Sequence, residues 1–194
     1  MHRFCAAILI GSTLLCSGFI FSEQRIKTYE DAWDQAYSLF TKDHPHEAIK
    51  IIRLISDQNI PVREEDVFYV RSLAALAARP IFRELTLAIK LLKAIYEVKK
   101  DDYATNLMLF AFALDKQNEA EVIEFAKALI HSDYRAYLKE MEPAKMSSIE
   151  EIRNYHDRMI KTYEYIASLF RGVDDALEKK AKEIVATLKA HNPQ

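Results

Sequence analysis

Apolar residues recur at three- and four-residue steps along most of the chain, a pattern typical of amphipathic helices. Three stretches with this pattern are rough copies of one another: Glu47–Ile55, Leu87–Ile95 and Glu121–Leu129. Their corresponding small or branched residues, Ala48, Ala88 and Val122, are spaced by 40 and then 34 residues. A helical unit that recurs at this interval indicates an array of helix pairs, in which each pair buries one face against the next.

The pattern predicts antiparallel helix hairpins over about residues 27–57, 63–99, 101–131 and 147–191. In the first hairpin, a helix over Lys27–Lys42 ends at Asp43-His44, and Pro45 suits the first turn of the next helix. Arg79-Pro80 separates the two helices of the second hairpin, the later of which is predicted over Phe82–Lys99. No stretch shows the alternation of a strand, so we predict an all-α fold.

The third hairpin is predicted to be the most buried. Asp101 is the expected N-cap of its first helix. The centre of that helix, from Leu107 to Leu114, is apolar on nearly every side, which predicts burial by neighbours on both flanks.

After Ser132 the repeat interval lapses, and a short helix is predicted over Asp133–Met141. Ser147-Ser148, followed by two glutamates, forms the capping signature of a long helix that Gly172 is expected to end. The last helix, Asp174–His191, is expected to carry a surface pair of Glu178 and Lys182, four residues apart.

The N-terminus resembles a secretory signal peptide, because residues 4–21 are uncharged and follow Arg3. Ile20-x-Ser22 fits cleavage before Glu23, so residues 1–22 are expected to be removed, leaving residues 23–194 as one periplasmic or secreted domain. Two alternatives stay open: the apolar run is long enough to remain as a membrane anchor, and Cys16 is a candidate for lipidation. Each outcome places residues 23–194 outside the cytoplasm.

Composition then narrows the class of activity. Both cysteines, Cys5 and Cys16, lie in the segment expected to be removed, and Gly172 is the one glycine that follows it. The mature chain therefore has no disulfide, thiolate zinc site or cysteine nucleophile. It also lacks the glycines of a phosphate loop, a dinucleotide fingerprint or a nucleophile elbow. We expect a protein that is not an enzyme and binds no cofactor.

Charge changes this picture little. The chain has 27 Lys and Arg residues against 29 Asp and Glu residues, and the two signs are interspersed. Without a sustained basic stripe, nucleic acid is not an expected partner.

Two polar groups have the composition of a chemical site without its spacing. Asp43-His44-Pro45-His46-Glu47 places two histidines around a proline at a helix start, which does not make ligands converge on a metal. His156 and Asp157 are neighbours in sequence, so on a helix their side chains point in different directions. Neither group is predicted to be a metal or catalytic site.

The aromatic residues are expected mainly to pack. Tyr29, Trp33 and Tyr37 form a stripe that we assign to the core. Five of the ten tyrosines fall in the last third of the chain, where packing is favoured over a contact surface: Tyr134, Tyr137, Tyr155, Tyr163 and Tyr165.

The units resemble tetratricopeptide repeats, without the glycine of that family's pattern. The first unit carries the resemblance through Trp33, Ala36, Phe40, Ala48, Ile52, Ile55 and Pro61. Later units keep its second half, through Ala88, Leu92 and Ile95, then Val122, Ala126 and Leu129, and finally Ala181, Val185, Leu188 and Pro193. The resemblance implies a right-handed solenoid of helix hairpins whose concave side binds a protein or peptide. The positions that face that side in the family correspond here to Asp31, Asp34, Ser38 and Thr41.

The expected function is thus an exported scaffold that docks a protein or peptide partner in the cell envelope. One alternative is a membrane-tethered assembly subunit of an envelope complex, attached through residues 4–21. The other is a small-ligand binder or hydrolase that uses the tyrosine-rich C-terminal region. The sequence does not identify the partner.

Overall fold

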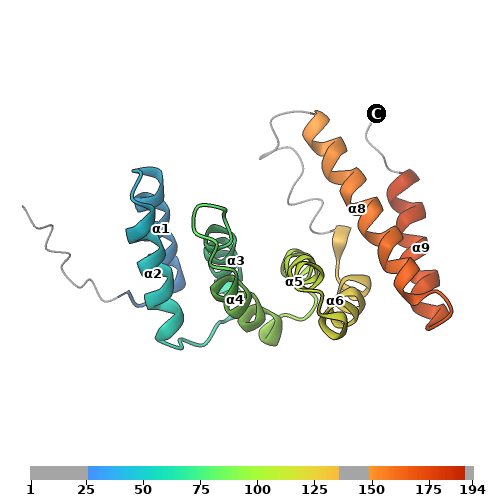
Figure 1. The fold of residues 1–194 in the computed structure, drawn as a ribbon, viewed down its shortest axis with the longest axis horizontal. Coiled ribbons are helices and arrows are strands. Elements are labelled where there is room, and N and C mark those ends of the chain that lie inside the picture. Colours follow the sequence, from blue (N-terminus) through green and yellow to red (C-terminus); the bar gives the residue numbers. More distant parts are fainter. Residues whose placement is uncertain (1–25, 136–148, 191–194) are drawn as a thin grey trace, which may run out of the picture.

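A computed structural model describes residues 26–135 and 149–190 (Figure 1). Within these ranges the chain forms eight α-helices and no β-strand, which confirms the all-α prediction. The helices are α1 (Tyr29–Thr41), α2 (Pro45–Asp57), α3 (Val67–Ala77), α4 (Leu85–Val98), α5 (Tyr103–Asp115), α6 (Glu119–His131), α8 (Ile149–Phe170) and α9 (Asp175–Ala190), with a short 3-10 helix over Glu64–Asp66.

Local chemistry explains where several helices begin. The Thr28 hydroxyl accepts the Asp31 N–H at 3.0 Å and caps α1. The Asp102 carboxylate accepts the Thr105 N–H at 2.9 Å, so the N-cap of α5 is Asp102, and the assignment of that role to Asp101 is wrong. Pro45 occupies the first turn of α2, as predicted.

The breaks between helices use left-handed backbone conformations. Asp43, Asn59, Arg83 and Gln117 have φ between 50° and 63°, and Gly172 has φ of 71° just after α8. Arg83 also explains why α4 begins at Leu85 and not at Phe82 as predicted. The turn it forms lets the Glu84 N–H reach back to the Ala77 carbonyl at 3.1 Å, and the helix starts only after that contact.

Helices that follow one another pair closely: α1 with α2, α3 with α4, α5 with α6, and α8 with α9. Alanines with no exposed surface line these pairs, which lets the backbones approach one another. They include Ala32, Ala36, Ala48, Ala74, Ala77, Ala88 and Ala126. In Figure 1 the pairs follow one another in chain order along the long axis of the molecule.

Contacts between successive pairs combine apolar burial with a few polar bridges. Helix α3 packs on α1, and α5 packs on α4. Between the first two pairs, the Tyr69 hydroxyl donates to the Glu30 carboxylate at 2.8 Å, and Lys90 Nζ donates to the Ser56 carbonyl at 2.9 Å. Between the second and third pairs, Arg71 Nη1 binds both carboxylate oxygens of Asp102, at 2.9 and 2.8 Å.

The last pair joins the rest through α6, which contacts α9. At this junction the Tyr163 hydroxyl donates to the Leu129 carbonyl at 3.0 Å, and burial raises the pKa of Tyr163. Tyr163 is fully buried, Tyr134 and Tyr155 are half-buried, and Tyr165 is exposed. Most of the described late tyrosines therefore contribute to packing.

Several predictions lie outside the described residues. They are the signal peptide with its cleavage site before Glu23, lipidation at Cys16, the capping signature at Ser147-Ser148, Tyr137, and most of the helix expected over Asp133–Met141. Across residues 26–135 and 149–190, no helix has both the length and the apolar character needed to cross a membrane.

Candidate functional site

The polar groups that the sequence singled out do not converge in the structure. His44 and His46 are exposed at the start of α2, and no three metal-ligating side chains cluster in the described part of the chain. His156 is buried in α8, whereas its neighbour Asp157 faces solvent. The described residues therefore bring no group of three ligands together around His44 and His46, and His156 and Asp157 do not face a shared space.

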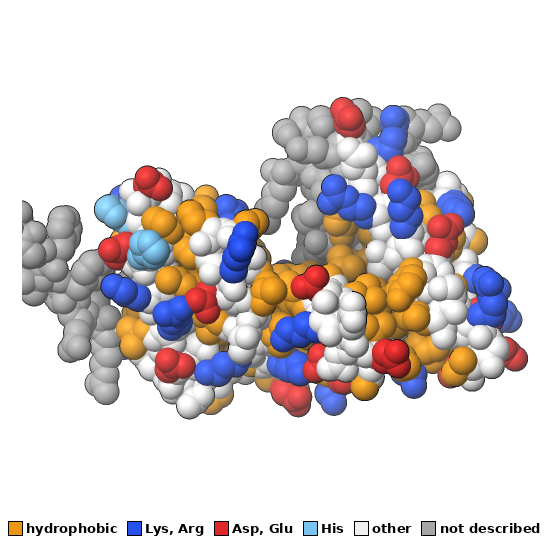
Figure 2. Space-filling model, in the orientation of Figure 1, with side chains coloured by type: hydrophobic (Ala, Val, Ile, Leu, Met, Phe, Trp, Pro, Cys, Tyr) orange, Lys and Arg blue, Asp and Glu red, His pale blue; other side chains and the backbone are white. Residues whose placement is uncertain are grey.

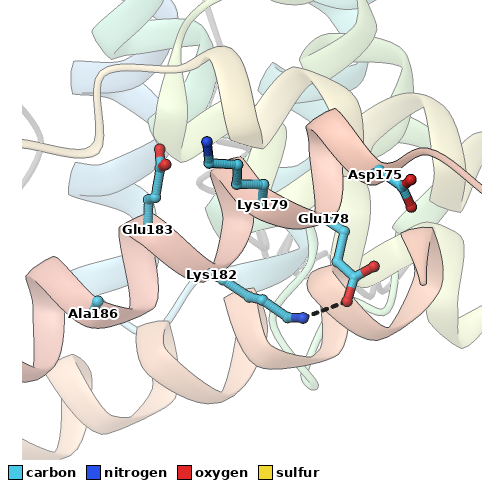
Figure 3. A pocket seen from close by; sticks show the side chains of 6 residues that line it. All are labelled: Asp175, Glu178, Lys179, Lys182, Glu183 and Ala186. Carbon is cyan, nitrogen blue, oxygen red and sulfur yellow. Dashed lines mark ion pairs between the residues drawn. The ribbon is translucent and has the colours of Figure 1, made fainter. Parts of the chain in front are cut away.

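A hollow on α9 lacks the enclosure of a chemical site. Its lining residues all come from that one helix: Asp175, Glu178, Lys179, Lys182, Glu183 and Ala186 (Figure 3). Lys182 and Glu178 form the predicted ion pair, so each neutralises the other. Because a single helix supplies every wall, no second element encloses a ligand there.

The exposed side of α1 is chemically more distinctive. Glu30, Asp34, Tyr37 and Thr41 follow one another at steps of four, three and four residues, which places them on one face of the helix. Their side chains are exposed, while Ala32 on the opposite side is fully buried. This face therefore presents two carboxylates and an aromatic ring to solvent.

Its aromatic part contradicts one prediction. Tyr29 is buried, as expected, and donates its hydroxyl proton to the Ile60 carbonyl at 2.7 Å. Tyr37 is 47% exposed, so its assignment to the core is wrong. Each four-residue step turns the stripe by about 40° around the helix, because an α-helix has 3.6 residues per turn. Trp33, between the two, is half-buried and stacks on Tyr37 with ring centroids 5.0 Å apart and planes inclined by 26°.

Helix α3 extends the same surface. The Tyr69 hydroxyl reaches Glu30, and this hydrogen bond, with the nearby charge of Asp34, raises the pKa of Tyr69. Phe68 is 49% exposed and meets the Tyr69 ring edge-on, with centroids 5.4 Å apart. We call this surface the acidic–aromatic face; it consists of Glu30, Trp33, Asp34 and Tyr37 of α1 with Phe68 and Tyr69 of α3.

The charge of the acidic–aromatic face is negative. Helix α1 contains Glu30, Asp31 and Asp34 and no Lys or Arg. None of these three carboxylates forms an ion pair with another described residue. On the α3 side, Arg71 is held by Asp102, and Arg79 lies over the Phe40 ring at 4.8 Å.

The residues predicted to bind a partner lie on and beside this face. Asp31, Asp34 and Thr41 are exposed, and Ser38 is half-buried. The Thr41 hydroxyl donates to the Ser38 carbonyl at 3.0 Å, so its proton is used within the helix. Sequence reasoning did not select Glu30, Tyr37, Phe68 or Tyr69. The sequence did hold a signal for two of them. Glu30 lies four residues before Asp34, and Tyr37 lies four residues after Trp33.

A second apolar surface belongs to α5. Leu114 is 37% exposed, Ala111 is exposed, and Leu107 is half-buried. Helix α5 has neighbours on both flanks, α4 and α6, as predicted, but the expectation that it has no solvated side is wrong. Apolar residues extend around more of α5 than its contacts with α4 and α6 cover. Figure 2 shows hydrophobic side chains over the part of the molecule where α5 and α6 lie, among side chains of both charge signs.

Comparison of the chain with protein-family models, with curated proteins and with solved structures gave no match.

Proposed function

We propose that the protein is a non-catalytic scaffold that docks a protein or peptide partner on the acidic–aromatic face. The observation that carries this proposal is the exposure of stacked and edge-on aromatic rings on two neighbouring helices, beside carboxylates of α1 that form no ion pair with a described residue. Tyrosine and tryptophan combine a large apolar area with few rotamers, so they bind partners at a small entropic cost. Asp31, Asp34, Ser38 and Thr41 form the flank of this site in the proposal.

We further propose that the helix pairs form a right-handed, tetratricopeptide-like solenoid. In support, the second pair contacts the first through Tyr69 and Glu30, and the third through Arg71 and Asp102. The first bridge joins the first helices of two pairs, and the second joins α3 to the N-cap of α5, the body of which packs on α4. In such a stack the first helices of the pairs form one continuous surface, and the acidic–aromatic face is its first section.

The location in this proposal is the cell envelope, with residues 1–22 acting as an export signal. The apolar run at residues 4–21 supports this location and equally supports the alternative of a membrane-tethered assembly subunit. Mass spectrometry of the N-terminus distinguishes them. A free Glu23 supports the exported scaffold, whereas an intact Met1 or a lipid on Cys16 supports the tethered subunit.

Site-specific photocrosslinking in the producing cells tests the docking proposal. A photoreactive phenylalanine analogue replaces Tyr37 or Phe68 on the acidic–aromatic face. In a matched control it replaces Leu54, which is 47% exposed on α2. We expect discrete protein adducts from positions 37 and 68 and none from position 54. Equal adducts from all three positions, or none from positions 37 and 68, would refute docking on this face.

A further inference from the structure

We propose that the docked segment carries an arginine or lysine, whose cationic group lies on the Tyr37 ring beside the Asp34 carboxylate. This inference rests on the proposed docking function and specifies the chemistry of the partner.

The Tyr37 ring is the first element of this subsite. Trp33 covers one of its faces, and 47% of the side chain remains exposed, so surface on the other side is open to solvent. A cation placed within about 6 Å of the ring centroid is attracted by the negative face of the π-system. Arg79 already makes such a contact with Phe40, at 4.8 Å, where α1 and α3 meet.

The carboxylates supply the second element. Asp34 precedes Tyr37 by three residues and borders its ring on the same face of α1. Glu30 lies one turn further from the ring, about 10 Å along the helix from Tyr37. The Tyr69 hydroxyl donates to Glu30 at 2.8 Å and so fixes a second negative charge on the same face, which adds to the attraction of a cation. Asp34 has no ion-pair partner within the described residues.

The negative charge of α1 disfavours an acidic partner segment. An acidic segment would meet three carboxylates on α1, and the Arg71 cation on α3 is already neutralised by Asp102. Lys27 and Lys42 lie just outside the two ends of the helix, so they do not interrupt this charge. A cationic side chain therefore gains both Coulomb attraction and contact with the ring.

The neighbouring helix α3 suggests a second residue of the partner segment, next to its cation. Phe68 offers an exposed apolar ring on this helix. Tyr69 meets Glu30 and Arg79 meets Phe40, so Phe68 at the start of α3 lies level with Tyr29, about 12 Å along the helix from Tyr37. With about 8–10 Å between packed helices, the two rings are roughly 15 Å apart, and an extended peptide covers about 3.3 Å per residue. The partner segment is thus expected to place an apolar residue about four to five positions from its arginine or lysine.

Trp33 makes the inference directly testable, because it is the single tryptophan in the chain and lies in the subsite. The full-length protein, in a mild non-ionic detergent, is titrated with decapeptides that contain Arg-Ala-Ala-Ala-Leu. Matched peptides replace arginine by lysine, glutamine or glutamate. The arginine and lysine peptides are expected to change Trp33 fluorescence saturably, and the glutamine peptide to bind about tenfold more weakly. Raising the salt concentration is expected to weaken the cationic peptides further.

Variants locate the binding. Asp34→Lys is expected to weaken the arginine peptide by about tenfold or more, and Tyr37→Ala by about threefold to fivefold. Glu183→Lys is the matched charge reversal, since Glu183 is exposed on α9 (Figure 3) and lies far along the chain from α1. It is expected to leave binding unchanged. Circular dichroism confirms that each variant keeps its helices.

The outcomes separate this inference from the function on which it rests. Equal binding of glutamine and arginine peptides, or undiminished binding by Asp34→Lys, overturns the cationic assignment. Spermidine that competes as well as the arginine peptide indicates a small polycation and overturns the peptide assignment. Absence of binding by every peptide also overturns the inference, while adducts from positions 37 and 68 would still support docking.

Discussion

Removing the charge of Asp102 tests how strongly two neighbouring helix pairs depend on each other. This carboxylate has two roles: it caps α5 through the Thr105 N–H at 2.9 Å, and it binds Arg71 of α3 through both oxygens. The side chains of Arg71 and Asp102 are only 19% and 12% exposed. Solvent therefore screens this pair much less than a surface ion pair.

Two substitutions separate these roles. Asp102→Asn keeps a side-chain oxygen for the cap and loses the charge, so it is expected to lower the free energy of unfolding by about 2 kcal/mol. Asp102→Ala loses the cap as well, which adds about 1 kcal/mol. In a double-mutant cycle, Arg71→Met and Asp102→Asn should show a coupling energy of about 1–1.5 kcal/mol.

Urea unfolding, followed by circular dichroism at pH 7, measures these free energies. The matched control is the pair of Lys189 and Glu164, whose nitrogen and oxygen lie 2.7 Å apart with side chains 57% and 47% exposed. Its coupling should not exceed about 0.5 kcal/mol. If the Arg71–Asp102 coupling is as small as that of the control, the bridge does not join the two pairs energetically.

The pH dependence of the same variants has a defined sign. Burial alone would raise the pKa of Asp102, but hydrogen bonds from Thr105 and the charge of Arg71 lower it overall. The folded state then binds this proton more weakly than the unfolded chain does. The stabilisation by Asp102 is therefore complete above the ordinary carboxyl pKa of about 3.9 and is lost as the pH falls through the lower folded value. Wild type and Asp102→Asn should converge in stability over that acidic range.

Two further predictions concern the last helix pair, both measured by urea unfolding. Tyr163→Phe is expected to lower the free energy of unfolding by about 1 kcal/mol, because it removes the buried hydrogen bond to the Leu129 carbonyl. That carbonyl still accepts the Ser132 N–H at 3.2 Å. A loss below about 0.3 kcal/mol would mean that the tyrosine hydrogen bond adds nothing to stability. Gly172→Ala is expected to lower the free energy of unfolding by about 1 kcal/mol. The cause is backbone strain at φ of 71°, since nothing lies within 4 Å of the added carbon. If Gly172→Ala costs no more than Val173→Ala, a change at an exposed site, backbone strain is not the cause.

The helices were predictable because their apolar spacing depends only on which residues must leave water. The buried alanines Ala48, Ala88 and Ala126 all lie in stretches that the sequence analysis selected. Helix starts were less predictable. Asp101 and Asp102 are identical residues in adjacent positions, and only the structure shows which of them also faces Arg71.

The candidate surface was predictable in part. Asp34 and Thr41 were selected through the resemblance to tetratricopeptide repeats; both are exposed on α1, and their role in binding a partner stays a prediction. Tyr37 was misassigned because aromatic residues are treated as core by default. The contribution of Tyr69 and Phe68 could not be obtained from spacing, since it depends on how α3 lies against α1.

The fully buried alanines have a consequence for how this protein can change its partners. Ala32 and Ala36 of α1 and Ala74 and Ala77 of α3 have no exposed surface, so exchanging one for glycine, serine or valine alters the distance between backbones. A docking surface made from two helix faces widens or narrows with that distance. Selection therefore has a way to retune recognition from the interior, leaving every residue that meets the partner unchanged.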